Sequence, residues 1–290
     1  MGLFQRKQDD SLTALVIADL QAGSAFAPFP ADFMRSTGDV SDLNEGQKDL
    51  NRFWAHMVGR LPPKLDYLLL VGDMIEGQQW KERGRYLTEV DPQWQARAAV
   101  EMLEPIAKRA SEIYVLEGTH YHVGEAGTWE EWVARSLGAE PDAWGHHAYD
   151  WLLLDVEGII LDVGHHQSVT IVNTTMPLER ELRHSLMIDD VRPDVDLIIR
   201  AHSHLYRWLC IDGRLMLACP PMQLQTHYAR HSKTPNRYFS RLLGSVLLTL
   251  YPGRKTPECT NREDYIKHEA LWYNHPPLVA VSKAKGRKKR

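Results

Sequence analysis

Short aliphatic runs recur along the chain, and most are bounded by glycine, proline or polar residues. Runs of this kind are typical of strands that are buried on both faces of a sheet. The pattern therefore predicts a set of mainly central strands. The predicted strands are Leu12–Ala18, Leu65–Val71, Glu112–Leu116, Trp151–Val156, Ile159–Val163, Val195–Arg200, Trp208–Ile211, Leu215–Ala218 and Leu242–Tyr251.

Between several of these strands, apolar residues recur at three- and four-residue steps, which is the spacing of one helix face. The predicted helices are Glu45–Arg60, Pro92–Arg109, Thr128–Leu137 and Pro177–Ile188. In the second helix, Pro92 suits the first turn, whereas Pro105 predicts a kink or an early end. The alternation of strands and helices predicts an α/β fold, or a layered α+β fold.

The chain has 290 residues, of which 43% are hydrophobic and 25% are charged. These values are those of a globular protein and exclude a disordered or fibrous chain as a whole. We find no internal repeat and no linker, so we expect a single domain over residues 1–282 with its core in 12–251. Residues 22–42 form an unusually long connection, and we expect a rim or a lid there.

The last eight residues, 283–290, carry six positive charges and almost no apolar surface, which predicts a disordered basic tail. Without these charges the formal net charge of -4 becomes -10. The acidic body argues against a broad basic face for duplex DNA, although it leaves a local basic patch open.

No apolar run is long enough to span a bilayer, and the opening residues turn acidic where a signal peptide would be apolar. We therefore expect a cytoplasmic protein that makes no membrane contact. The three cysteines form no CxxC pair, so a disulfide framework is not expected. Fourteen histidines favour a metal site or acid–base chemistry, but only their positions can decide between these roles.

Several predicted strands are followed directly by short polar clusters rich in Asp, His and Gly. Ligands of open α/β sheets bind beyond the carboxyl ends of the strands, where these clusters fall. An Asp-x-Gln or His-x-His segment in an extended chain also directs both side chains to one side. The clusters are DLQ from Asp19, GDMIE from Gly72, GTHY from Gly118, GHH from Gly164 and AHSH from Ala201.

Carboxylates that converge with several imidazoles make a mixed oxygen and nitrogen environment, which suits Mn²⁺, Fe or Zn²⁺. A bridging carboxylate would hold two ions roughly 3.5 to 4 Å apart, an arrangement that activates water for phosphoryl displacement. Asp19 and Asp73 each also have an ordinary interpretation, because Asp is common as a helix cap or turn former after a strand.

The five clusters, in this order over residues 19–204, resemble the motif series of the calcineurin-like metallophosphoesterase superfamily. The resemblance implies a four-layer fold with a central β-sandwich flanked by helices. It also implies a metal-dependent hydrolase that cleaves phosphate mono- or diesters by direct attack of water, without a covalent phosphoenzyme. Two divalent metal ions are implied, with Mn²⁺ preferred over Fe, Zn²⁺ or Mg²⁺.

Carried over position by position, the resemblance implies two groups of metal ligands that share Asp73 as the bridge. The first group is Asp19, Gln21, Asp73 and His204. The second group is Asp73, Thr119, His202 and one of His165 and His166, of which we prefer His165 because it directly ends its strand. His120 is implied to contact the substrate phosphate and to help protonate the leaving group.

Four positions depart from the family pattern. Gln21 replaces a histidine, Thr119 replaces an asparagine, Tyr121 replaces an acidic residue, and Ala201 replaces a glycine, which is a minor change in extended backbone. The first two changes predict weaker or altered metal binding. They also favour an alternative function, in which the chain keeps the fold as a binding or scaffold protein without catalysis.

The metal motifs do not choose among phosphatase, phosphodiesterase and nuclease activity. Nucleic acid and nucleotides remain candidate substrates, since the motif layout also resembles the nuclease branch and the tail is cationic. Lys81, Arg83 and Arg85 closely follow the GDMIE motif and are candidate contacts for substrate phosphates, although the pattern slightly favours a solvated loop. The oligomeric state does not follow from the sequence.

Overall fold

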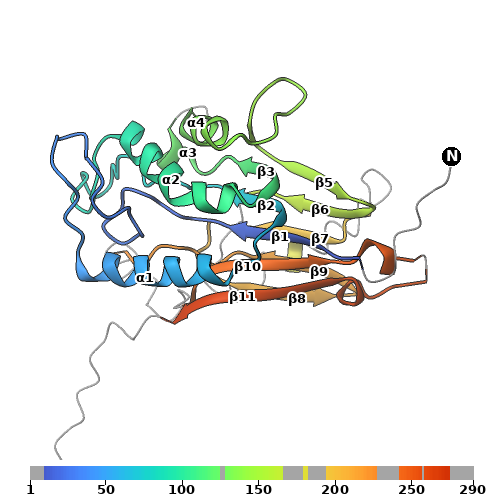
Figure 1. Cartoon of the computed structure of the whole chain (residues 1–290). Helices are drawn as coiled ribbons and strands as arrows, with labels where there is room; N and C mark the ends of the chain where they lie inside the picture. The colour runs from blue at the N-terminus through green and yellow to red at the C-terminus, as the bar shows by residue number, and fades with distance from the viewer. Residues whose placement is uncertain are drawn as a thin grey trace, which may run out of the picture.

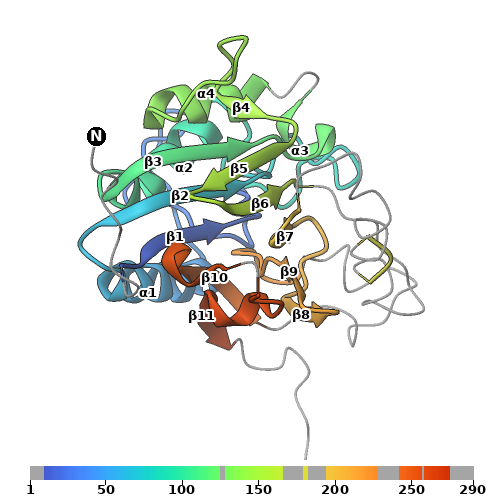
Figure 2. The same ribbon diagram turned by 90° about the vertical axis from the view of Figure 1, so that its right-hand side faces the viewer.

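The structure, a computed structural model, describes residues 10–124, 128–165, 179–181, 194–226, 242–256 and 258–274. Two β-sheets dominate these residues, one of six strands and one of five (Figures 1 and 2). The six-stranded sheet has the order β11-β10-β1-β2-β3-β4. Its strands are β1 (Leu12–Ile17), β2 (Leu65–Val71), β3 (Ala110–Leu116), β4 (Ala148–Tyr149), β10 (Leu242–Leu250) and β11 (Ile266–Asn274).

The five-stranded sheet has the order β5-β6-β7-β9-β8. Its strands are β5 (Leu152–Val156), β6 (Ile159–Val163), β7 (Leu197–Arg200), β8 (Arg207–Ile211) and β9 (Arg214–Ala218). The central strands of both sheets are parallel: β1, β2, β3 and β4 in the first, and β6, β7 and β9 in the second. Their carboxyl ends therefore lie together at one end of each sheet.

Four α-helices connect the strands of the first sheet (Figure 1). Two short 3₁₀-helices, Pro252–Arg254 and Arg262–Asp264, lie between β10 and β11. The α-helices are α1 (Glu45–Arg60), α2 (Pro92–Ala107), α3 (His120–Val123) and α4 (Thr128–Leu137). Asn44 begins α1 with a reciprocal capping box to Gln47, which satisfies backbone donors at the first turn.

Two apolar cores hold these layers together. One lies between the six-stranded sheet and α1, α2 and α4, where Leu15 and Leu68 of the sheet meet Trp54 and Leu103 of the helices. The other lies between the two sheets and includes Val16 and Leu69 from the first and Leu161 and Ile199 from the second. Burial on both faces explains why β1 and β2 are almost continuous aliphatic runs.

The predicted layered α/β fold is confirmed in its two sheets and in the helices that cover the six-stranded sheet. Pro105 lies inside α2, which ends two residues later at Ala107 rather than at Arg109. The strands β4 and β11 were not predicted. The predicted helix Pro177–Ile188 falls outside the described residues except for 179–181, which are helical, and the tail 283–290 also falls outside them.

The long connection over 22–42 is attached to the residues that precede α2. Arg35 donates from Nη1 to the carbonyl of Thr88 at 3.0 Å, and the backbone N–H of Ser36 donates to Glu89 at 2.8 Å. These contacts make the segment a fixed rim. In the part of the chain that the structure describes, no helix is long and apolar enough to cross a membrane.

Candidate metal centre

The ends of β1 and β2 continue beside each other as two loops that carry the first two motifs. The backbone N–H of Asp19 donates to the carbonyl of Gly72 at 3.1 Å, and that of Gln21 donates to the carbonyl of Asp73 at 3.0 Å. These bonds extend the parallel register of Ile17 with Leu70 beyond the strands. The sheet thus fixes the two acidic loops relative to each other.

Five of the predicted ligands have left-handed backbone, with φ between 49° and 65°. The extended conformation expected after these strands is therefore wrong at these positions. Residues other than glycine rarely adopt this conformation, and it costs of the order of 1 to 3 kcal/mol at each position. Strained backbone of this kind is often found at functional sites. The five residues are Asp19, Gln21, Asp73, His202 and His204.

Asp73 lies at the centre of the cluster and is 1% exposed. The backbone N–H of Thr119 donates to its Oδ1 at 2.7 Å, and the Thr119 hydroxyl lies 3.2 Å from the same oxygen. A Cβ on Gly118 would lie 2.1 Å from Oδ1, so only glycine leaves room for this carboxylate. Burial would raise the pKa of Asp73, but the charges of His165 and His122 outweigh burial and lower it.

His165 is buried next to Asp73. Its Nδ1 donates to the carbonyl of Val71 at 2.7 Å, which leaves Nε2 directed at Oδ2 of Asp73, 3.0 Å away. Burial would lower the pKa of His165, but the Asp73 carboxylate raises it to about 10. The ring centroid of His202 lies 5.5 Å from that of His165. One donor atom each from Asp73, His165 and His202 lie within 4.8 Å of one another.

Asp19, Gln21 and His204 form a second group beside the first. Nε2 of His204 lies 3.2 Å from Oδ1 of Asp19 and 3.3 Å from the amide nitrogen of Gln21. Burial would lower the pKa of His204, but the charge of Asp19 raises it. The backbone N–H of His202 lies 3.3 Å from Oδ2 of Asp19, which joins the two groups.

The donor set fits divalent metal ions. Oε1 of Gln21 is buried and accepts no hydrogen bond from the described residues, and buried Oδ1 of Asp19 faces Nε2 of His204 at 3.2 Å without any further donor among them. Buried oxygens without a donor are costly, and a bound cation would satisfy them. The two carboxylates also raise the pKa of His165 and His204, so this environment favours positive charge. Carboxylate, amide and imidazole ligands together suit Mn²⁺, Fe or Zn²⁺.

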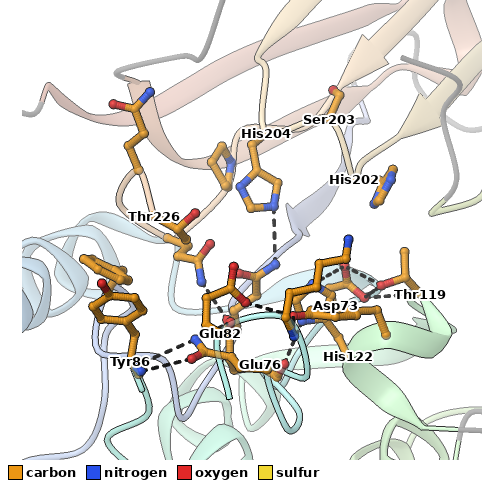
Figure 3. Close-up of a pocket in the computed structure, with 18 residues that line it drawn as sticks. Asp73, Glu76, Glu82, Tyr86, Thr119, His122, His202, Ser203, His204 and Thr226 are labelled. Atoms are coloured by element: carbon orange, nitrogen blue, oxygen red, sulfur yellow. Dashed lines mark hydrogen bonds and ion pairs between the residues drawn. The ribbon is translucent and has the colours of Figure 1, made fainter. Parts of the chain in front are cut away.

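A pocket of about 320 Å³ opens above this cluster. In Figure 3, Thr119 and His202 lie at one end of the pocket and Tyr86 and Thr226 at the other, with Glu76 and Glu82 between them. Gln21, Asp73, Thr119, His202 and His204 all line it. The structure therefore brings predicted ligands from four motifs to a single pocket.

The structure places His120 and His122 on different sides of α3 with respect to the pocket. His120, the predicted substrate contact, is exposed at the first position of α3 and does not line the pocket. His122 lines the pocket instead, and its Nε2 lies 3.9 Å from Oδ2 of Asp73. Its Nδ1 donates to the carbonyl of Glu76 at 2.7 Å, which fixes the ring. Because α3 begins at His120, its single turn directs His122 and not His120 toward the metal cluster.

The basic residues after the second motif divide between the two interpretations that the sequence left open, a solvated loop and a contact with substrate. Arg83 and Arg85 are exposed and do not line the pocket, because the loop turns their side chains outward. Lys81 does line it, and its Nζ lies 5.1 Å from the centroid of the Tyr121 ring. The Tyr121 hydroxyl is 3.1 Å from a carboxylate oxygen of Glu82, so Tyr121 supports the pocket wall.

Glu76 is the last residue of its motif and is held by two glutamines. Nε2 of Gln79 and Nε2 of Gln223 each donate to its carboxylate at 2.7 Å. Burial raises the pKa of Glu76. The sequence did not indicate Gln223, because this residue belongs to none of the motifs that carry predicted ligands.

His166 lies outside the described residues, so the preference for His165 rests on the contact of His165 with Asp73.

No protein-family model and no curated protein matches this sequence. Among solved structures, the chain is similar to Vps29 complexed with Zn²⁺ from Entamoeba histolytica, with 14% identity, TM-score 0.37, and coverage of 90% of this chain and 99% of that one. The phosphoesterase Yfce from E. coli gives 11% identity, TM-score 0.41, and coverage of 90% and 100%. A novel archaeal phosphodiesterase gives 8% identity, TM-score 0.40, and coverage of 89% and 99%.

At these identities and TM-scores, the activity of the chain has to be inferred from its own residues. Those residues form the predicted two-sheet sandwich, with the motif clusters at the carboxyl ends of β1, β2, β3, β6 and β7. The layered arrangement of two sheets that the sequence predicts is thereby confirmed, and the superfamily itself stays a resemblance that the motif series carries.

Proposed function

We propose that the protein is a metal-dependent phosphoesterase that binds two divalent ions, with Mn²⁺ as the first candidate. The observation that carries this proposal is the buried cluster in which Asp73 contacts His165 while Asp19 contacts His204. Packing alone does not explain two buried carboxylates that each face an imidazole and lie under an open pocket.

In this proposal Asp73 lies between two ligand groups. Asp19, Gln21 and His204 would hold one ion, and Thr119, His165 and His202 would hold the other. Bound ions of this kind activate water and neutralise the charge of a phosphate ester. The Val71 carbonyl supports the second group, because it accepts from Nδ1 of His165 and so keeps Nε2 toward the site.

The chain's own residues then supply binding and proton transfer. His122 points Nε2 into the pocket near Asp73 and is fixed by the Glu76 carbonyl, so it can donate a proton to the leaving oxygen. Lys81 is the lysine that lines the described pocket, and its ammonium suits a phosphate oxygen. Glu76 and Glu82 lie in the same pocket and would repel an anionic substrate unless cations are bound beside them.

One observation favours the alternative scaffold function. The Thr119 hydroxyl lies 3.2 and 3.4 Å from the two oxygens of Asp73 and donates to that carboxylate, which ties its oxygen to Asp73 and makes it a poorer ligand than a free amide oxygen. A second site with this poorer ligand would bind its ion more weakly. The scaffold function would keep the fold and the pocket without turnover.

The test combines metal analysis with turnover. The purified protein is expected to bind about two Mn²⁺ per chain and to hydrolyse either a mono-aryl or a bis-aryl phosphate. Single-stranded and duplex DNA are tested beside these esters to identify a nuclease, and the comparison is repeated without residues 283–290. Absence of bound metal together with absence of turnover on every substrate with Mn²⁺, Mg²⁺, Fe²⁺ and Zn²⁺ would leave the scaffold function.

A further inference from the structure

The end of the pocket away from the metal cluster has an aromatic wall. Phe26 and Tyr86 both line the pocket, with ring centroids 5.5 Å apart and ring planes inclined at 50°. Figure 3 shows Tyr86 and Thr226 at the end opposite Thr119 and His202. A ligand that reached from one end to the other would have its phosphate at the cluster and its organic part at Tyr86.

Hydrogen bonds fix this wall to the motif loops. The backbone N–H of Ala25 donates to the carbonyl of Tyr86 at 2.8 Å, and that of Tyr86 donates to Oε1 of Gln79 at 3.1 Å. Gln79 in turn donates to Glu76, which belongs to the second metal motif. The position of the Tyr86 ring relative to the metal cluster is therefore set by a continuous hydrogen-bonded path.

A cation lies near the Tyr86 ring. The guanidinium carbon of Arg85 lies 5.6 Å from the centroid of the ring, although Arg85 does not line the pocket. A cation at this range is attracted to the ring face. The backbone of Tyr86 is fixed by its hydrogen bonds, and its ring is in contact with Phe26 and Arg85, so the ring is supported by the protein itself.

The chemistry of this end suits a planar ring that carries polar edges. Aromatic side chains provide a stacking surface for any base. Gln225 and Thr226 line the pocket as well, and their side chains offer hydrogen-bond donors and acceptors. A volume of about 320 Å³ is at the small end of the range for small-molecule sites, so the pocket encloses a single organic group.

Building on the proposed function, we propose that the substrate is a phosphate ester of a nucleoside, whose base stacks on Tyr86. The ring of a simple aryl ester is joined directly to the phosphate oxygen and would lie beside the metal cluster. A sugar between phosphate and base would span the middle of the pocket, where Glu76 and Glu82 lie (Figure 3). The aromatic wall and the metal cluster then bind the two ends of one nucleotide.

The experiment compares adenosine 5′-monophosphate with ribose 5-phosphate. Both probes leave through the primary 5′-hydroxyl of a ribose and differ in the base at C1′, so the reactivity of the ester bond does not separate them. Binding to the Mn²⁺-loaded protein is measured by calorimetry, and kcat/KM is measured where turnover occurs. Loss of base stacking is expected to weaken binding roughly 10-fold or more for ribose 5-phosphate.

Variants of Tyr86 test whether the aromatic wall of Phe26 and Tyr86 causes the preference for the probe with a base. Tyr86→Leu should remove most of the difference between the two probes, whereas Tyr86→Phe should keep it, because stacking needs the ring and not the hydroxyl. Trp144→Leu is the matched control, since Trp144 is 83% exposed and does not line the pocket. That control should leave the ratio of the two dissociation constants at its wild-type value.

The outcomes separate this inference from the proposed function. Equal binding of the two probes by the wild-type protein, or an unchanged ratio in Tyr86→Leu, overturns the nucleoside inference even if aryl phosphates are hydrolysed. Absence of turnover on all esters overturns the phosphoesterase function, and the calorimetric ratio still decides whether the pocket binds a nucleotide. A stronger preference for phenyl phosphate than for either probe also counts against the nucleoside.

Discussion

Nε2 of His165 lies 3.0 Å from Oδ2 of Asp73, while Nδ1 of the same ring donates to the carbonyl of Val71. The carbonyl belongs to the last residue of β2, and Asp73 follows two residues later. One strand end therefore both orients the imidazole and supplies its carboxylate partner. A Cβ on Gly72 would lie 2.4 Å from Nδ1 of this ring, so the residue between them has to be small.

Asp73→Asn should abolish binding of both ions, because Asp73 is the proposed shared ligand. Activity is expected to fall by more than about 100-fold, since loss of supporting contacts alone costs 10- to 100-fold. Metal content by elemental analysis and turnover with Mn²⁺ check this. The matched control is Asp212→Asn, an exposed aspartate that also has positive φ, and it should retain both properties. Retention of two ions by Asp73→Asn would contradict the bridging role.

His122→Ala should lower kcat by roughly 100-fold or more and retain the metal, because general acid–base groups contribute at least this factor. His120→Ala should have a much smaller effect, since His120 is exposed and does not line the pocket. The measurement is kcat and metal content for the two variants in parallel. A large loss of kcat in His120→Ala alone would restore the role that the motif series implies for His120.

Gln21→His should raise affinity for the first ion by about 10-fold, because an imidazole is a stronger ligand than an amide for Mn²⁺, Fe or Zn²⁺. Gln21 lies 3.3 Å from Nε2 of His204, so a ring at this position would face the same ion. Isothermal titration with Mn²⁺ and Zn²⁺ checks the change. An unchanged first dissociation constant would place Gln21 outside the ligand group.

Gly118→Ala should displace the Asp73 carboxylate and weaken metal binding at least about 10-fold, a change comparable to the loss of a supporting contact. The added Cβ would lie 2.1 Å from Oδ1 and 2.4 Å from the backbone nitrogen of Asp73. Gly59→Ala is the control, because Gly59 is exposed in α1 and a Cβ there meets nothing within 4 Å. Denaturant melts should show lower stability for Gly118→Ala and slightly higher stability for Gly59→Ala.

Glu130 should make stability depend on pH. Burial, and then the charge of Asp73, raise its pKa from 4.5 to about 8. Between these values the folded protein keeps a proton that the unfolded chain has lost, so this contribution to stability is complete below about pH 4.5 and falls as the pH rises toward 8. Glu130→Gln keeps the acceptor for the Met74 N–H and removes the titration. Denaturant melts at pH 5 and pH 8 should show a smaller decrease for the variant; equal decreases would contradict the shift.

The strands and helices with strong apolar patterns were predicted with nearly correct bounds. Those of β2, β6 and α1 agree at both ends. The strand β11 was missed because Lys267, His268 and Glu269 interrupt its apolar pattern, as is common for strands at a sheet edge. The two residues of β4 are too few for any pattern.

The candidate site was predicted because its polar clusters directly follow aliphatic runs, and this order is visible in the sequence. Whether His120 or His122 faces the pocket depends on where α3 begins. A helix of four residues is too short to show a periodic apolar pattern in the sequence. The left-handed backbone of the ligands was also missed, because glycine is the usual sequence signal for that conformation and none stands at those positions. The sequence named Lys81 among the basic residues after the GDMIE motif but could not tell which of them lines the pocket, and Tyr86 was not predicted, because loop residues are placed by tertiary contacts.

The left-handed backbone of the proposed ligands lowers the stability of the fold, whereas their side chains form the site. Glycine would relax the backbone at Asp19, Gln21, Asp73, His202 and His204, and it would remove the donor atom at each. Selection for thermal stability alone would therefore erase the cluster while leaving the sandwich intact. The five donor side chains therefore occupy positions that cost the fold stability, while the apolar cores that hold the two sheets together lie elsewhere.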